Sequence, residues 1–223
     1  MQSIRIICWG GMEIDHLMWA CADLDAGVEE IERLTGVRAE LSGSHRGLGT
    51  RNALLSLGQT YLEIIAPDPN QDLEGNFGGR LAALNDTGLL SFAMTYRGLE
   101  ELRAKLADKG VMVSGVQKTH RDTTEGLSLE WELLFVRSIP GAPFYIDWLE
   151  CAHPATTSPV GCELLNLDVA VSDTGEFEKL TRKANLLSLK EDDSEKSVSL
   201  TAKLKTPNGI VKLVPLTETI ALF

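Results

Sequence analysis

Three polar side chains, His16, Glu63 and Asp147, stand among apolar neighbours in the short segments IDHLMWA, YLEIIA and FYIDWL. Each segment reads as a strand, and alternate residues of a strand share a face, so each polar group lies among apolar side chains. An ionised carboxylate in such surroundings is disfavoured unless a cation or hydrogen-bond donors satisfy it. One imidazole and two carboxylates suit Zn²⁺, Mn²⁺, Fe²⁺ or Ni²⁺, with water at the open positions. The sequence predicts a divalent-metal site at these residues.

A second interpretation stays open for each of these residues. Taken singly, His16 is more often an interior histidine held by a hydrogen bond, and Glu63 more often meets an arginine or backbone amides. A bound metal would polarise adjacent substrate oxygens as a Lewis acid and stabilise an enediolate, while Glu63 or His45 moves a proton. Isomerase, lyase and dioxygenase reactions all fit that chemistry. No organic cofactor is expected.

The segment SGSHRGLGTRN, residues 42–52, combines glycines with polar side chains in an otherwise acidic chain. The glycines allow a tight backbone that approaches a ligand closely. We predict a binding loop that takes a carboxylate or carbonyl oxygen on its cations while a histidine exchanges a proton. The residues concerned are His45, Arg46, Thr50, Arg51 and Asn52. In the alternative, the segment is a glycine-rich turn whose threonine and asparagine satisfy local backbone groups.

Other candidate residues are weaker. His153 precedes a proline, a context typical of extended or turning backbone, so a linker role is favoured over a site role. His120 lies in the polar stretch KTHRDTTEG, which we expect to be a loop. Large aromatic side chains dominate buried area, so four of them are expected in the core or the wall of a cleft. These are Trp19, Phe92, Trp131 and Trp148, of which Trp148 is assigned to substrate binding.

The elements that must position these residues follow one order twice. A strand at 14–22 leads into a helix that Asp23 or Asp25 can cap and that Gly36 ends, followed by strands at 52–57 and 61–66. From residue 88 the order returns, with the strand LLSFAMTYR, the amphipathic helix LEELRAKLADKGV, and strands at 111–116, 127–136 and 144–149. Internal repetition of this length indicates duplicated halves.

The predicted fold class is α+β, with paired β-α-β-β-β units whose curved mixed sheets surround a cleft. We expect the first unit at 12–68, a linker at 69–87, the second unit at 88–153 and a C-terminal partial βαββ unit at 160–223. Residues 1–11 are expected to be peripheral. Facing halves would bring the histidine and the two acids together although they are far apart in the chain.

The composition argues against some classes of binding partner. The 223 residues carry a formal charge of −11, which repels nucleic acid and anionic membranes, so neither is expected as a partner. No apolar run approaches the length of a membrane span or a signal-peptide core, so a cytoplasmic location is expected. The four cysteines show neither C-x-x-C nor zinc-finger spacing, which favours buried reduced thiols: Cys8, Cys21, Cys151 and Cys162.

Three segments together, IDHLMWACADLD, SGSHRGLGTRNALLSLGQTYLEIIAPD and PFYIDWLECAHPA, carry a family resemblance. In this order they resemble the glyoxalase-like branch of the vicinal-oxygen-chelate superfamily, which includes glyoxalases, bleomycin-resistance proteins and extradiol dioxygenases. The resemblance covers most of residues 14–155. It implies the fold and a cleft, while members of the superfamily run several chemistries and some only sequester ligands.

In metal-dependent members of that superfamily, the ligands lie on the first and last strands of each unit. In the first unit these positions fall on His16 and Glu63. Matching the two helix entries sets Ser91 opposite His16, and the last strand sets Asp147 opposite Glu63. A neutral hydroxyl is a poor metal ligand, so Ser91 departs from the pattern and is assigned to substrate binding instead.

Two functions therefore stay open. The first is a metal-dependent lyase, isomerase or dioxygenase of glyoxalase-like type that uses the site described above. The second is a metal-free protein that binds or sequesters a small molecule, as resistance-type relatives do, and Ser91 favours it. A small-molecule ligand is the expected partner in both cases. Dimers are common in the superfamily, so the resemblance also allows a homodimer.

Overall fold

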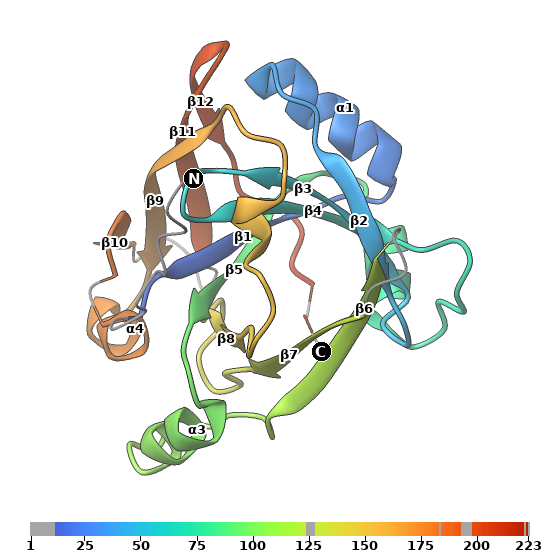
Figure 1. Ribbon diagram of the computed structural model, residues 1–223. Helices are drawn as coiled ribbons and strands as arrows, with labels where there is room; N and C mark the ends of the chain where they lie inside the picture. The colour runs from blue at the N-terminus through green and yellow to red at the C-terminus, as the bar shows by residue number, and fades with distance from the viewer. Residues whose placement is uncertain (1–11, 124–127, 183, 193–197, 221, 223) are drawn as a thin grey trace, which may run out of the picture.

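A computed structural model of the chain describes residues 12–123, 128–182, 184–192, 198–220 and 222. Two units follow the same order of elements (Figure 1). The first contains β1 (Ile14–Ala20), α1 (Leu24–Thr35), β2 (Glu40–His45), β3 (Thr50–Ser56) and β4 (Tyr61–Pro67). The second contains β5 (Gly88–Thr95), α3 (Leu99–Ala107), β6 (Gln117–Thr123), β7 (Ser128–Leu134) and β8 (Phe144–Asp147). The short helix α2 (Phe77–Ala82) lies between the units.

The eight strands of the two units form one closed barrel, in the order β1-β4-β3-β2-β6-β7-β8-β5. Within each unit the first and last strands are parallel, as β1 with β4 and β5 with β8. The units meet through two antiparallel pairs, β1 with β5 and β2 with β6. The predicted α+β class with paired units is therefore confirmed, and the two curved sheets join at both edges. Among the described residues, each barrel strand is paired on both sides, although β2 and β6 pair at only two positions.

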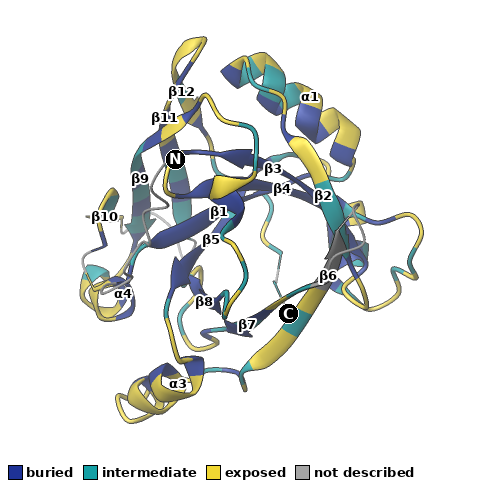
Figure 2. Ribbon diagram, in the orientation of Figure 1, coloured by how far each residue is buried: buried dark blue, intermediate teal, exposed yellow. Residues whose placement is uncertain are grey.

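Each barrel strand has one inward and one outward face, and both are apolar along much of their length. On β1, Leu17 and Trp19 belong to the outer core, while Met18 and Ala20 pack inside the barrel. Figure 2 shows the central strands buried, with exposed residues on the outer side of α1 and α3. Burial on both faces explains the nearly continuous apolar runs in the sequence.

Helix α1 covers the outer face of the first unit. Asp23 is its N-cap, with its side chain accepting a hydrogen bond from Ala26 N, and Gly36 ends the helix at φ 78°. Helix α3 begins differently, because Gly98 precedes it in a left-handed conformation with φ 80° and no side chain caps it. The predicted cap and stop of α1 are thus confirmed, with Asp23 rather than Asp25 in the capping position.

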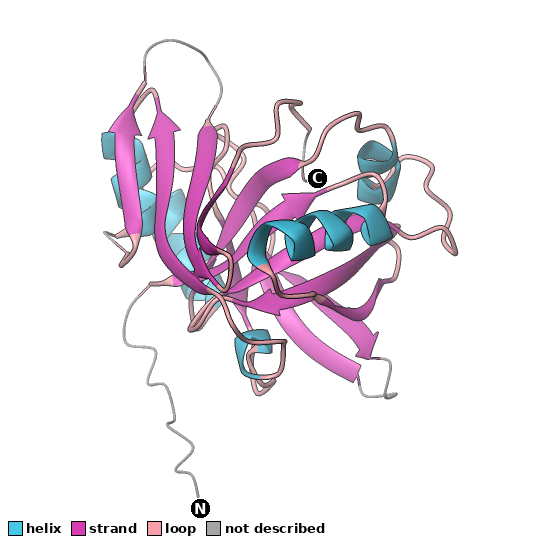
Figure 3. Ribbon diagram, turned by 90° about the horizontal axis from the view of Figure 1, so that it is seen from above, coloured by secondary structure: helices cyan, strands magenta, loops and turns pink. Residues whose placement is uncertain are grey.

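The C-terminal part forms a second sheet of four strands beside the barrel (Figure 3). Its elements are β9 (Glu163–Val171), α4 (Thr174–Thr181), β10 (Leu187–Glu191), β11 (Ser199–Thr206) and β12 (Gly209–Leu213). The first strand β9 is parallel to β10, the strand directly after the helix. In the barrel units the first strand pairs with the last one instead. The C-terminal part therefore has one strand more than predicted and a different pairing.

Some predicted elements differ from the structure. His120, expected in a loop, lies on β6, which pairs with β2 and β7 in the barrel wall. The predicted binding loop at 42–52 is a hairpin, because β2 ends at His45 and β3 begins at Thr50. No strand forms at 111–116, where a single bridge joins Val113 to Val136. Pairing with neighbouring strands outweighs the weak local pattern of these segments.

Cysteines and membrane segments can be compared with expectation within the described residues. Cys21 and Cys162 are buried free thiols, while Cys151 is free and half-buried. Burial raises the pKa of the Cys21 thiol to about 12. Cys8 and the prefix 1–11 lie outside the described residues. In the described part of the chain, no helix is both long and apolar enough to cross a membrane.

Candidate functional site

The barrel encloses a cavity of about 500 Å³, a size typical of small-molecule pockets. Its inner wall is aromatic, with Trp131, Phe135, Phe144 and Trp148 among the lining side chains. His16 on β1 and Glu63 on β4 face this cavity. The ring of His16 stacks on Tyr61 at 4.7 Å between centroids. The described residue Leu222, near the end of the sequence, also lines the cavity.

A bulge in β1 gives His16 its partner. The pairing of β1 with β5 shifts between Ile14 and His16, so Asp15 is the extra residue. A bulge re-aims side chains, and here the Asp15 carboxylate reaches the ring of its own neighbour. His16 Nδ1 lies 2.7 Å from Asp15 Oδ1. A carboxylate accepts only, so Nδ1 carries the proton and Nε2 is left as the basic nitrogen.

The carboxylate of Asp15 is fully buried and accepts three hydrogen bonds. Besides His16, its Oδ2 atom accepts from Trp148 Nε1 at 3.0 Å and from His153 Nε2 at 3.2 Å. Burial alone would raise its pKa, but the hydrogen bonds from His153 and His16 outweigh that effect and hold the pKa at about 2. Asp15 is therefore an anion at neutral pH, and it fixes the orientation of both histidines.

Glu63 stands on the other side of His16. Its Oε2 atom lies 3.7 Å from His16 Nε2, and its Oε1 atom accepts a hydrogen bond from Asn52 Nδ2 at 2.6 Å. His45 Nε2 lies 4.0 Å from Oε1, while His45 Nδ1 is 3.0 Å from Thr50 Oγ1. Asn52 Oδ1 is buried and has no hydrogen-bond partner among the described residues. It can accept a hydrogen bond from a ligand.

The predicted binding residues fall into two groups. Arg46 and Thr50 line the cavity, Asn52 holds Glu63, and Trp148 both lines the cavity and donates to Asp15. Arg51 lies between two inward-facing residues of β3, so strand alternation turns it to the outer face, away from the cavity. Ser91 is buried on β5 opposite Met18, but it is not among the residues that line the cavity.

Asp147 does not join His16 and Glu63. Its neighbours Phe144 and Ile146 line the barrel cavity, while its own carboxylate accepts from Gly98 N at 2.8 Å and Leu149 N at 2.9 Å. It borders a separate hollow of about 340 Å³ outside the barrel. Asp147 thus satisfies backbone groups at the entry to α3, and the predicted set of three ligands does not form.

The pairing register explains the mismatch. Glu63 pairs with Met18 in the first unit, and Phe144 pairs with Ala93 in the second. Because the helices begin at Leu24 and Leu99, Ala93 is the counterpart of Met18. Phe144 is therefore the counterpart of Glu63. Asp147 lies three residues further along the chain.

These positions test the predicted metal site. The second unit presents a hydroxyl at Ser91 and a phenyl ring at Phe144, where the first presents an imidazole and a carboxylate. Among the described residues, no group of three or more His, Cys, Asp or Glu side chains is arranged to hold a metal ion. Two donors from one unit do not make the four-ligand site that the resemblance implies.

Sequence reasoning does not identify two residues of this site: it does not single out Asp15, and it favours a linker role for His153. Their contact joins residues 138 apart in the chain, and the bulge that exposes Asp15 to His16 depends on pairing with β5. The adjacent Asp-His pair in an apolar strand was the one available signal.

Comparisons with known proteins bear on the family and the fold. Residues 14–184 match the model of the glyoxalase-like domain family. A hypothetical protein from Staphylococcus aureus is 16% identical, with a TM-score of 0.61 over 92% of this chain and 86% of that chain, which shows a shared fold. No curated protein sequence matches the chain.

Two epimerase structures align with lower TM-scores. Methylmalonyl-CoA epimerase from Mycobacterium tuberculosis is 22% identical, with a TM-score of 0.44 over 60% of this chain and 85% of that chain. An epimerase from Streptomyces coelicolor in complex with 2-nitronate-propionyl-CoA is 25% identical, with a TM-score of 0.41 over 56% of this chain and 86% of that chain. Likenesses at this level do not indicate a function.

Proposed function

Because the chain belongs to the glyoxalase-like domain family of the vicinal-oxygen-chelate superfamily, we propose that its barrel binds a small molecule and transfers a proton on it. The proton is taken from a carbon next to a carbonyl or carboxyl group, with His16 as the base. The observation that carries this proposal is the row Asp15–His16–Glu63 at the wall of the cavity. Only two of the predicted metal ligands converge, so the proposed transfer uses side chains alone.

His16 is oriented for this role by Asp15. The hydrogen bond to Asp15 keeps the proton on Nδ1, so the lone pair of Nε2 is available to the substrate. When Nε2 takes up a proton, the positive imidazolium lies between two carboxylates, 2.7 Å from Asp15 and 3.7 Å from Glu63. Asp15 acts here as a positioning residue.

Glu63 completes the pair. It lies close enough to exchange a proton with His16 through a small movement or one water molecule, so a proton taken at one substrate atom can be returned at another. Isomerases and lyases need such a return. Asn52 and His45 hold or border Glu63 Oε1, and the unpartnered Asn52 Oδ1 can bind a hydroxyl or amide hydrogen of the substrate.

The test is hydrogen exchange in D₂O. A panel of 2-oxo acids, 2-hydroxy acids and aryl ketones is incubated with the protein, and loss of the α-proton signal is followed by NMR. Positioned acid–base groups contribute about 10²–10⁴ in rate, so His16→Gln and Glu63→Gln should each slow the exchange at least about a hundredfold. Glu29→Gln, on the exposed side of α1, is the matched control. Undiminished exchange in His16→Gln contradicts the proposal.

A metal-free sequestering protein is the second candidate. Phe144 favours it, because the second unit offers an aromatic wall where the first offers a carboxylate. Tight binding of panel compounds without any exchange by the wild-type protein would select this candidate over the enzyme.

A further inference from the structure

The charge around the cavity differs from that of the whole chain. The protein has 32 acidic and 21 basic side chains. Among the described residues that line the cavity, however, Glu63 is the single carboxylate, whereas three cations line it: Arg46, Arg80 and Lys118. Arg46 and Lys118 are exposed, while Arg80 is half-buried. Cations gathered at one cavity of an acidic protein indicate an anionic ligand.

Among these cations, Arg80 has a buried donor atom without a partner among the described residues. Its Nε atom is buried and has no hydrogen-bond partner in the described part of the chain, where no ion pair joins Arg80 to a carboxylate either. The guanidinium carbon lies 5.7 Å from the centre of the Phe77 ring, which holds the side chain against an aromatic face. Buried donors normally have an acceptor. We propose that the cavity binds an amphipathic anion whose charged group is held by Arg80.

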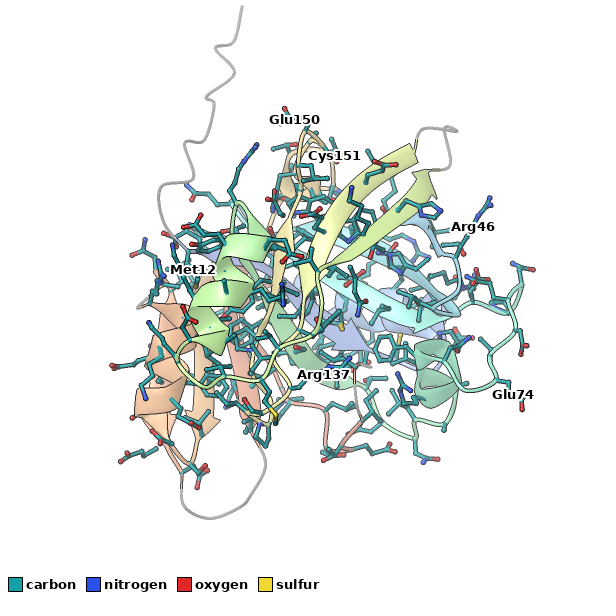
Figure 4. The ribbon with its side chains drawn as sticks, turned by 90° about the horizontal axis from the view of Figure 1, so that it is seen from below. Met12, Arg46, Glu74, Arg137, Glu150 and Cys151 are labelled. Atoms are coloured by element: carbon teal, nitrogen blue, oxygen red, sulfur yellow. The ribbon has the colours of Figure 1, made fainter. Side chains whose placement is uncertain are left out.

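The position of Arg80 is fixed by the fold. Asn76 caps α2 by accepting from Gly79 N, and Gly78 N donates to Leu48 O in the turn between β2 and β3. A side chain at Gly78 would collide with the backbone of Gly49, so the helix can sit this close only with glycine there. Figure 4 shows Arg46, in that turn, on the side of the molecule opposite Met12. Because α2 is hydrogen-bonded to this turn, Arg80 and Arg46 border the same part of the cavity.

Four aromatic side chains offer a binding surface for the apolar part of the ligand. The rings of Trp131 and Trp148 lie 5.3 Å apart at 43°, and those of Phe135 and Phe144 stack at 5.4 Å. These four rings line the same cavity as Arg80. Aromatic walls bind flat or apolar groups by burial and ring contact.

The two ends of the site are separated along β4. His16 pairs with Tyr61 at the start of this strand, and Thr50, beside the turn under α2, pairs with Pro67 at its end. The backbones at these two positions are roughly 20 Å apart along the strand. A ligand that reaches both Arg80 and His16 therefore extends along β4, with its charged group and its reacting carbon at different ends. This assignment of the ligand class rests on the proposed binding in the barrel.

The experiment compares two probes of the same shape, 4-(2-naphthyl)butanoate and its amide. Binding is measured through the fluorescence of the cavity tryptophans in the wild type and in Arg80→Gln. A charge-assisted hydrogen bond should make the carboxylate bind about tenfold or more tightly than the amide, and Arg80→Gln should remove this preference while changing the amide affinity less than about twofold. Arg33→Gln, on the exposed end of α1, should leave the preference intact.

Three results would overturn the assignment: equal binding of the two probes by the wild type, no binding of either, or an undiminished preference in Arg80→Gln. Arg80→Lys, which keeps the charge, should retain part of the preference if Arg80→Gln proves unstable in thermal unfolding. His16→Gln should keep the full preference, because His16 is not in the anion site. Loss of the preference in Arg80→Gln without any proton exchange by the wild type would uphold the anion site and reject the catalytic proposal.

Discussion

The two barrel units have the same order and pairing of strands but carry different side chains at equivalent positions. Both have a bulge in the first strand: β1 carries Asp15 in its bulge, and β5 carries Leu90 at the position 75 residues later. The next residue is His16 in one unit and Ser91 in the other. The paired last strands present Glu63 and Phe144. Strand pairing is thus independent of the polar residues: at equivalent positions one half carries an imidazole and a carboxylate, and the other carries a hydroxyl and a phenyl ring.

The helices show the same division. In the first unit the N-cap is local, since Asp23 accepts from Ala26 N in the same helix. In the second unit Gly98 has no such cap, and its N–H donates to Asp147 from β8 instead. The carboxylate that the sequence indicated as a ligand therefore satisfies the backbone at the start of α3. An acidic residue on a barrel strand can thus face the cavity, as Glu63 does, or accept backbone hydrogen bonds outside the barrel, as Asp147 does.

The largest expected effect is at the bulge. Asp15→Asn places an amide among three donors and removes the buried charge that they bind, so the free energy of unfolding should fall by roughly 3–5 kcal/mol. Leu90→Ala at the matching bulge should cost about 1–2 kcal/mol, because Leu90 is only partly buried. Urea unfolding measures both. If Asp15→Asn lowered the free energy of unfolding less than Leu90→Ala does, the bulge of β1 would not be the more important of the two for stability.

Acid should weaken the first unit through the same group. The folded-state pKa of Asp15 is about 2, below its ordinary value of 3.8, so its contribution is present above pH 4 and is lost as the pH falls toward 2. A shift of this size corresponds to roughly 2–3 kcal/mol. Wild-type stability should therefore decline more steeply than that of Asp15→Asn between pH 4 and pH 2. Parallel pH profiles of the two proteins would show that Asp15 titrates normally.

Rebuilding the second unit tests the metal interpretation. The double substitution Ser91→His and Phe144→Glu supplies the two donors that the pairing register places opposite His16 and Glu63. Zn²⁺ affinity should rise at least about tenfold over the wild type, since two ligands are added to two. Competition with a chromophoric chelator measures it. The same change combined with Glu63→Gln should lose most of the gain, and an equal gain without Glu63 would contradict the proposed equivalence.

The smallest effect is expected at Asp147. Asp147→Asn weakens the acceptor for Gly98 N and Leu149 N, and loss of such a cap costs about 1 kcal/mol of stability. Proton exchange and probe binding should stay unchanged, because this side chain lies outside the barrel. Chemical denaturation and the exchange assay measure the two properties. If Asp147→Asn stayed stable but lost proton exchange, Asp147 would have to be counted among the residues of the functional site.

Much of the fold could be predicted because local sequence patterns indicate its elements. The repeated order of strand, helix and strands, the cap at Asp23 and the stop at Gly36 all follow from periodicity and backbone preference. His16 and Glu63 could be singled out because polar groups are costly on apolar strands. The polar strand β6 was missed because its place in the sheet comes from pairing with β2 and β7 rather than from its own composition.

By itself the sequence determined the α+β class, the duplication and two of the residues that meet in the cavity. Tertiary structure alone decided that Asp147 points out of the barrel and that Phe144 takes the position equivalent to Glu63. It also decided that Asp15 and His153 are hydrogen-bonded to each other. The physical reason is the two-residue period of a strand, in which a shift of one position or one bulge moves a side chain to the opposite face.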